Sequence, residues 1–174
     1  QRNQLRNRHQ PRRSTVATTI RTRNGFVIVI TLIISIMLML VPLPDYARFF
    51  RPEWVVMTLI YWAMALPHRV SIGVAWFTGF IMDITMGGIL GVMAFSYALA
   101  IYLIARFHLQ LRQYPLWQQA LTIFSVVLLV EFVDVVATRA TLHWESWMPV
   151  LTSTLLWPVM YAILRKIRRT FQVT

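Results

Sequence analysis

Apolar residues are gathered into six runs along the chain, and short polar connections join each run to the next. Long apolar runs with few charges are typical of helices that cross a membrane. The sequence therefore predicts an all-α integral membrane protein with six transmembrane helices, over residues Phe26–Val41, Trp54–Leu66, Val70–Met86, Ile89–Ala105, Gln118–Ala137 and Trp147–Leu164.

The second run is the weakest of the six predictions, because it is much shorter than the roughly 20 residues that a perpendicular transmembrane helix needs. Its ends are nevertheless well marked. Pro52 stands near a helix start, and Pro67 stands where a helix should stop. A five-span alternative that merges the second and third runs would bury His68 and Arg69 in lipid.

The composition supports a membrane protein, since 57% of the 174 residues are hydrophobic and only 13% are charged. Most basic residues lie at the chain ends or in short connections, which argues against a nucleic-acid-binding surface. The absence of cysteine excludes disulfides, thiolate metal sites and cysteine nucleophiles. The four histidines show no metal-binding spacing, and the sequence predicts no metal and no cofactor.

Basic residues also predict the orientation. If six helices span and the N-terminus is cytoplasmic, fourteen of the seventeen Lys and Arg residues lie on the cytoplasmic side. The outer loops then hold Arg48, Arg51 and Arg139, and the acids Asp45, Glu53 and Glu145 nearly neutralise them. This asymmetry favours an even number of spans with both termini inside.

The two chain ends flank the helical region as basic segments. Residues 1–25 hold seven Arg and no acid, and we expect a disordered cytoplasmic tail there rather than a mitochondrial transit peptide. Residues 26–164 form the predicted transmembrane domain, and residues 165–174 form a second basic cytoplasmic end that can contact anionic lipid.

Three carboxyl groups lie inside apolar runs: Asp83 in the third, and Glu131 and Asp134 in the fifth. At 1.5 Å per residue, Asp83 and Glu131 each lie roughly 20 Å from the cytoplasmic edge, and Asp134 lies one turn above Glu131. We expect the three to converge in the outer half of the membrane, with Arg139 and His143 just above to pair with them.

A carboxylate in the bilayer needs compensation, so this cluster allows two interpretations. One is a structural polar contact, within the chain or with a partner helix. The other is an ion or proton site of a transporter subunit or carrier. A third hypothesis, an enzyme that uses Asp83 and Glu131 as acid and base, is the weakest, since no catalytic motif and no sizeable outer loop is present.

Small residues and one proline shape the predicted helices. Gly87 and Gly88 are expected to form the tight turn after the third helix, whereas Ala75, Gly79 and Gly91 are expected to allow close helix packing. Pro158 lies inside the last run and predicts a kink.

Several short motifs, in order from about Pro42 to Val173, resemble the proteobacterial rod shape-determining family MreD. They are "PLPD", "FRPEW", "ALPHRV", "MDITMGGILGV", "LWQQAL" and "LLWP" followed by a basic end. The resemblance implies a fold similar to the membrane substrate-binding subunit of energy-coupling-factor transporters, and it implies no enzymatic activity.

The same resemblance implies a scaffold role in the complex that elongates the cell wall. The partners implied are MreC directly, and the MreB filament, the glycosyltransferase RodA and a class B transpeptidase through the complex, with membrane lipids around it. The candidate structural or partner-contact residues in the matching motifs are Arg51, Pro52, Trp54, Pro67, His68, Arg69, Asp83, Gly87 and Gly91.

Four further residues are candidates from the residue pattern alone: Ala75, Gly79, Glu131 and Asp134. The short second helix and the small stripe formed by Ala75 and Gly79 are the places where we expect another chain's helix to dock.

Overall fold

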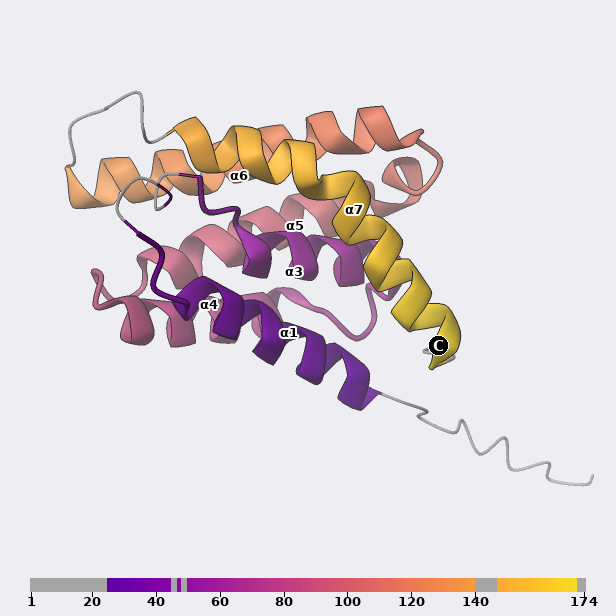
Figure 1. The fold of residues 1–174 in the computed structure, drawn as a ribbon, viewed down its shortest axis with the longest axis horizontal. Coiled ribbons are helices and arrows are strands. Elements are labelled where there is room, and N and C mark those ends of the chain that lie inside the picture. Colours follow the sequence, from indigo (N-terminus) through magenta and orange to yellow (C-terminus); the bar gives the residue numbers. More distant parts are fainter. Residues whose placement is uncertain (1–24, 45–46, 48–49, 140–146, 172–174) are drawn as a thin grey trace, which may run out of the picture.

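The computed structural model describes residues 25–44, 47, 50–139 and 147–171, and the elements in these residues are six α-helices (Figure 1). The tail before Gly25 and His143 lie outside the described residues. The helices are α1 (Gly25–Leu40), α3 (Trp54–Ala65), α4 (Ile72–Met86), α5 (Val92–Leu111), α6 (Leu116–Thr138) and α7 (Met148–Thr170).

Each predicted apolar run corresponds to one helix, so the all-α fold class is confirmed. Two helices extend beyond their predicted ends, because α5 continues from Ala105 to Leu111 and α7 continues from Leu164 to Thr170. Among the described helices, α5, α6 and α7 are long and apolar enough to cross a membrane, whereas α1, α3 and α4 are shorter apolar helices.

Successive helices run in alternating directions through one bundle, and the start of α1 lies at the same end as the finish of α7 (Figure 1). The turns therefore gather at two ends of the bundle. The loop before α3, the turn between α4 and α5, the finish of α6 and the start of α7 share one end, which also holds all the described acidic residues.

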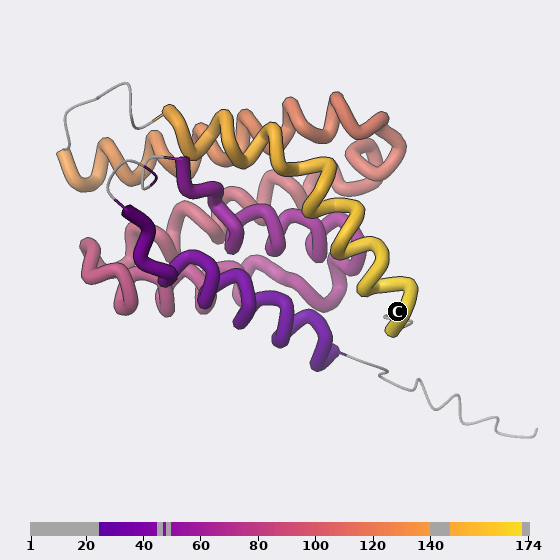
Figure 2. The backbone as a smooth tube through the Cα atoms, viewed as in Figure 1, coloured from indigo at the N-terminus to yellow at the C-terminus, as the bar shows by residue number. Residues whose placement is uncertain are grey.

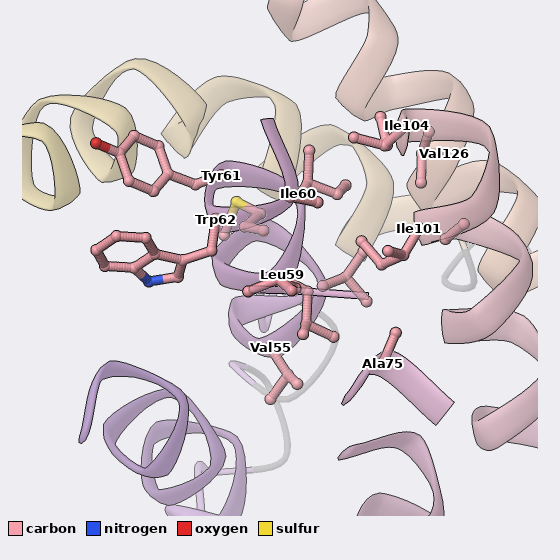
Figure 3. Close-up of a cluster of buried hydrophobic side chains, with 14 of the residues drawn as sticks. Val55, Leu59, Ile60, Tyr61, Trp62, Ala75, Ile101, Ile104 and Val126 are labelled. Carbon is pink, nitrogen blue, oxygen red and sulfur yellow. The ribbon is translucent and has the colours of Figure 1, made fainter. Parts of the chain in front are cut away.

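The short helix α3 occupies the centre of the bundle and packs against α1, α5 and α7. All of its residues except Trp54 are buried. Leu59 and Ile60 of α3 lie among Ile101 and Ile104 of α5, near Val126 of α6 (Figure 3). The hydrophobic core is therefore built around a helix that is apolar on every side.

Hydrogen bonds between side chains join α1 to α3. Ser35 Oγ lies 2.6 Å from Thr58 Oγ1, and the Trp62 indole N–H donates to Thr31 Oγ1 at 2.9 Å. All four side chains are buried. Polar contacts of this kind hold helices together in a membrane, where burial of apolar surface contributes little to helix association.

The last helix bends, as its internal proline predicts. Pro158 lies inside α7, and the tube in Figure 2 changes direction along this helix, so that its C-terminal part diverges from α6. Proline removes one backbone hydrogen bond and frees the carbonyl of Thr154. The basic residues Arg165 and Arg168 follow the bend and are carried on its helical end.

Candidate functional site

The Asp83 carboxylate caps the N-terminus of α5. Its Oδ2 accepts hydrogen bonds from the backbone N–H groups of Gly91 and Ala94, at 2.9 and 3.1 Å, and Oδ1 accepts one from Met93 at 2.9 Å. The first N–H groups of a helix lack partners inside the helix, and a negative charge there is stabilising. Both Asp83 oxygens are thus engaged within the chain, and the side chain is only 2% exposed.

The turn that makes this cap possible depends on two glycines. Gly87 ends α4 with φ +67°, and Gly91 precedes α5 with φ +97°, a left-handed conformation that other residues rarely adopt. A Cβ at Gly91 would meet no neighbouring atom within 4 Å. The expectation that Gly91 serves close helix packing is therefore wrong, since its role is conformational.

Gly79, in contrast, is a close-packing residue as expected. A Cβ at this position would lie 2.5 Å from the carbonyl oxygen of Met93 and 2.6 Å from the Cα of Ala94. Ala75, one turn earlier, is fully buried. The backbones of α4 and α5 can approach closely only because Gly79 lacks a side chain.

These contacts correct the predicted docking places for another protein. Gly79 is covered by α5 of the same chain, and nearly all of α3 is buried among the chain's own helices. Neither the second helix nor the stripe of Ala75 and Gly79 leaves a face free to receive a helix from another chain. Both predicted docking places are therefore wrong.

The loop before α3 ties three helices together. Arg51 donates from its two terminal nitrogens to the carbonyl oxygens of Met39 and Val41, at 2.6 and 2.7 Å, and so caps the end of α1. The backbone N–H of Glu53 donates to Ser153 Oγ of α7 at 2.9 Å. Pro52 is buried between these two residues, and this loop therefore fixes α1 and α7 relative to α3.

Glu53, which the sequence placed in an outer loop, is buried in the structure. Its Oε2 and the hydroxyl of Tyr97 on α5 are both buried and make no hydrogen bond of good geometry in the described structure, although the two groups lie close enough to interact. Burial, and then the nearby carboxyl of Glu131, raise the pKa of Glu53 from 4.5 to about 8.

Glu131 and Asp134 lie one turn apart on α6, and both are partly exposed. Asp134 lies within electrostatic range of Asp83, and Glu131 within range of Glu53. The predicted convergence of acids in this half of the bundle is thus present, with Glu53 as an additional member. Among the described residues, no basic side chain forms an ion pair with Glu131 or Asp134.

Arg139 was expected to pair with these acids, but in the structure it does not. It is the C-cap of α6, where it adopts a left-handed conformation with φ 52°. In the part of the chain that the structure describes, no three His, Asp or Glu side chains are placed to hold a metal ion.

An open pocket of about 270 Å³ lies on the surface of the bundle beside Glu131. Its walls come from one face of α6 and from the residue that precedes α7. They are almost entirely apolar and consist of Ser125, Leu128, Leu129, Glu131, Phe132, Val135 and Trp147. We call this pocket and the exposed α6 face around it the α6 groove. No feature of the sequence predicted a cavity at this place.

The remaining candidates, Pro67, His68 and Arg69, form the turn between α3 and α4 at the opposite end of the bundle. The backbone N–H of Arg69 donates to the Leu66 carbonyl at 3.0 Å. The Arg69 guanidinium lies beside the start of α1, where a Cβ added at Gly25 would be 3.1 Å from its nitrogen. His68 is exposed. The structure therefore separates this turn from the acidic residues.

Sequence reasoning missed three polar residues that matter in the structure: Tyr97, Gln119 and Ser153. Gln119 donates from Nε2 to the carbonyls of Leu111 and Tyr114, both at 3.1 Å, and so closes the turn between α5 and α6. Ser153 accepts the Glu53 N–H. The position of each polar residue inside an apolar run was the available signal, but the position does not show which group the side chain contacts.

Comparisons with known proteins agree with this architecture of apolar helices. A sequence profile described as rod shape-determining protein MreD matches residues 20–167. The rod shape-determining protein MreD of Haemophilus influenzae is 36% identical over 148 residues, which cover 83% of this chain and 91% of that protein.

No solved structure matches the chain, so the likeness to energy-coupling-factor transporter subunits stays a prediction. The profile and the relative both span most of the chain, including the capped α4–α5 turn and the α6 groove. The protein therefore belongs to the MreD family of rod shape-determining membrane proteins.

Proposed function

We propose that this protein is a non-catalytic scaffold of the bacterial inner membrane, which binds MreC and helps to organise lateral peptidoglycan synthesis during cell elongation. Through MreC it joins the MreB filament, RodA and a class B transpeptidase. Family membership supports the role in cell shape. The binding of MreC and the link to the other proteins of the complex are what the family resemblance implies.

One structural observation carries the scaffold proposal: the buried polar groups join helices of the same chain. Asp83 binds the start of α5, Arg51 binds the end of α1, and the loop residue Glu53 binds α7 through its backbone. A carrier that used Asp83 would need this carboxylate free for a solute, yet backbone groups occupy both of its oxygens. This arrangement favours a rigid bundle whose outer faces bind other proteins.

The proposed topology has six spans and both termini in the cytoplasm. Alternating helix directions support it, as does the common end of the bundle at which the chain enters α1 and leaves α7 (Figure 1). Because the chain contains no cysteine, single cysteines at Leu90 and Tyr114 can report each side. An impermeant thiol reagent applied to intact spheroplasts should label the cysteine at Leu90 and not the one at Tyr114.

The scaffold proposal is tested by co-purification in mild detergent with MreC of the same organism. Tagged wild-type protein should elute together with MreC, and an unrelated tagged six-span protein at the same expression level should not. Cells depleted of the protein should lose their rod shape and regain it when the wild type is supplied. Elution of a well-folded protein without MreC would reject the partner assignment.

A further inference from the structure

The α6 groove has the residue spacing of a helix-packing seam. Leu121, Ser125, Leu128, Phe132 and Val135 follow one another at intervals of four, three, four and three residues. Such alternation places side chains in one line along a helix and forms the holes into which a second helix inserts its side chains. The seam is about 21 Å long at 1.5 Å per residue.

Helices of this chain bury no residue of the seam fully, although Leu128 packs partly against the core. The buried residues of α6 are Gln119, Ile123, Val126, Val127 and Val130, and none of them belongs to the seam. Leu121 and Phe132 are 56% and 61% exposed. Ser125, the second residue of the seam, is small and allows the backbone of an incoming helix to approach closely.

An apolar face alone would be explained by lipid, but Glu131 adds a requirement that lipid tails do not meet. This residue borders the seam between Leu128 and Phe132 and lines the pocket. It has no basic partner among the described residues, and it lies within electrostatic range of a second acid, the buried Glu53. With no such partner in the described part of the chain, a carboxyl group on an apolar helix face favours contact with a cation or donor on a neighbouring helix.

The depth of Glu131 indicates the source of that donor. Seven residues separate it from Thr138 at the end of α6, which corresponds to about 10 Å along the helix. A side chain on a neighbouring transmembrane helix can lie at this depth, whereas lipid head groups remain nearer the surface. In helix pairs, residues that border the seam commonly form such charge pairs and determine which partner binds.

We propose that the α6 groove binds one transmembrane helix of another protein, and that this helix presents a Lys or Arg side chain to Glu131. The occupant has a small or apolar residue every three or four positions, which packs between Leu128, Phe132 and Trp147. This inference rests on the proposed function, in which the helix belongs to MreC.

Cysteine crosslinking tests the position of this helix. Single cysteines at Leu128, Phe132 and Val135, and control cysteines at the exposed positions Phe77 and Ile84 of α4, would be paired with single cysteines along the transmembrane helix of co-expressed MreC. Oxidation should crosslink the groove positions, with a repeat of three to four residues on the MreC helix, and not the controls.

Three outcomes would overturn the groove assignment and leave the proposed function standing. MreC could crosslink to the α4 positions alone, it could co-elute without forming any crosslink, or the groove cysteines could crosslink two copies of this chain. Failure of the wild type to co-elute with MreC would overturn both.

The charge pairing has its own test. Glu131→Gln keeps the side-chain shape, and we expect it to reduce MreC recovery by about tenfold or more. Thr138→Gln, at the exposed end of α6, is the matched control and should retain MreC. Each variant would first be required to keep the thermal midpoint of the wild type in detergent. A folded Glu131→Gln protein that retains full MreC recovery would exclude the charge pair.

Discussion

The backbone N–H of Glu53 and the hydroxyl oxygen of Ser153 are joined by a hydrogen bond of 2.9 Å, although one hundred residues separate them in the chain. This bond connects the loop before α3 to the first half of α7. Both residues are buried. Neither the N–H nor the hydroxyl can turn to water if the other is removed, so the bond should contribute measurably to stability.

Ser153→Ala should lower the free energy of unfolding by about 1–3 kcal/mol, because it leaves the Glu53 N–H buried without an acceptor. Denaturant or thermal unfolding in detergent would measure the change. Ser96→Ala is the control, since Ser96 is equally buried but its hydroxyl donates only to the Val92 carbonyl of its own helix. Equal effects of the two substitutions would contradict the assignment.

Asp83→Asn should destabilise the protein by about 2 kcal/mol. The amide keeps the size of the side chain, but it loses the negative charge and can accept with only one oxygen where three N–H groups now donate. Asp134→Asn provides the comparison, because Asp134 is partly exposed and caps no helix. The free energy of unfolding would be measured for both variants. An equal loss in Asp83→Asn and Asp134→Asn would contradict the importance of the cap.

Gly79→Ala should be the most disruptive of the glycine substitutions, with a loss of roughly 1–3 kcal/mol from overpacking. Its new methyl group would overlap the backbone of α5 at Met93 and Ala94. Gly88→Ala should be nearly neutral, since a Cβ there meets no atom within 4 Å. If thermal midpoints show Gly79→Ala to be as stable as Gly88→Ala, the two helices are not in close contact.

The stability of the protein should decrease as pH rises between about 4.5 and 8, because the folded state binds the Glu53 proton more tightly than the unfolded state does. The slope from this group is at most about 1.4 kcal/mol per pH unit. Glu53→Gln should remove this contribution, so that the variant is more stable than the wild type at pH 8 and similar to it at pH 4.5.

Thermal midpoints measured at several pH values in one detergent would provide the comparison. A variant with the same pH dependence as the wild type would show that other acids, such as the neighbouring Glu131 and Asp134, determine it instead.

The sequence predicted the helices well because apolar runs and the prolines at their ends are local signals. Pro52 and Pro67 flank α3 as expected, and Pro158 lies in the bent helix. The extension of α5 beyond Ala105 was missed, since the additional turns carry Arg106 and His108, which resemble a loop by composition although they continue the helix.

The candidate site was predicted less completely, because partners depend on tertiary packing. Asp83 and Glu131 were recognised as unusual acids, but the sequence could not show that backbone N–H groups already occupy Asp83. Glu53 was assigned to a loop on the basis of its neighbours, yet folding buries it beside Tyr97. The α6 groove depends on which face of α6 the other helices leave uncovered, and composition does not reveal that.

The enclosure of α3 resolves why this protein tolerates a helix of only 12 residues. Such a helix is about 18 Å long, well short of a hydrocarbon layer of about 30 Å. Hydrophobic mismatch acts on helices that touch lipid, and α3 is surrounded by protein along nearly its whole length. The thickness of the surrounding bilayer therefore imposes no minimum length on α3, and its ends are free to follow the loop at Arg51 and the turn at Pro67.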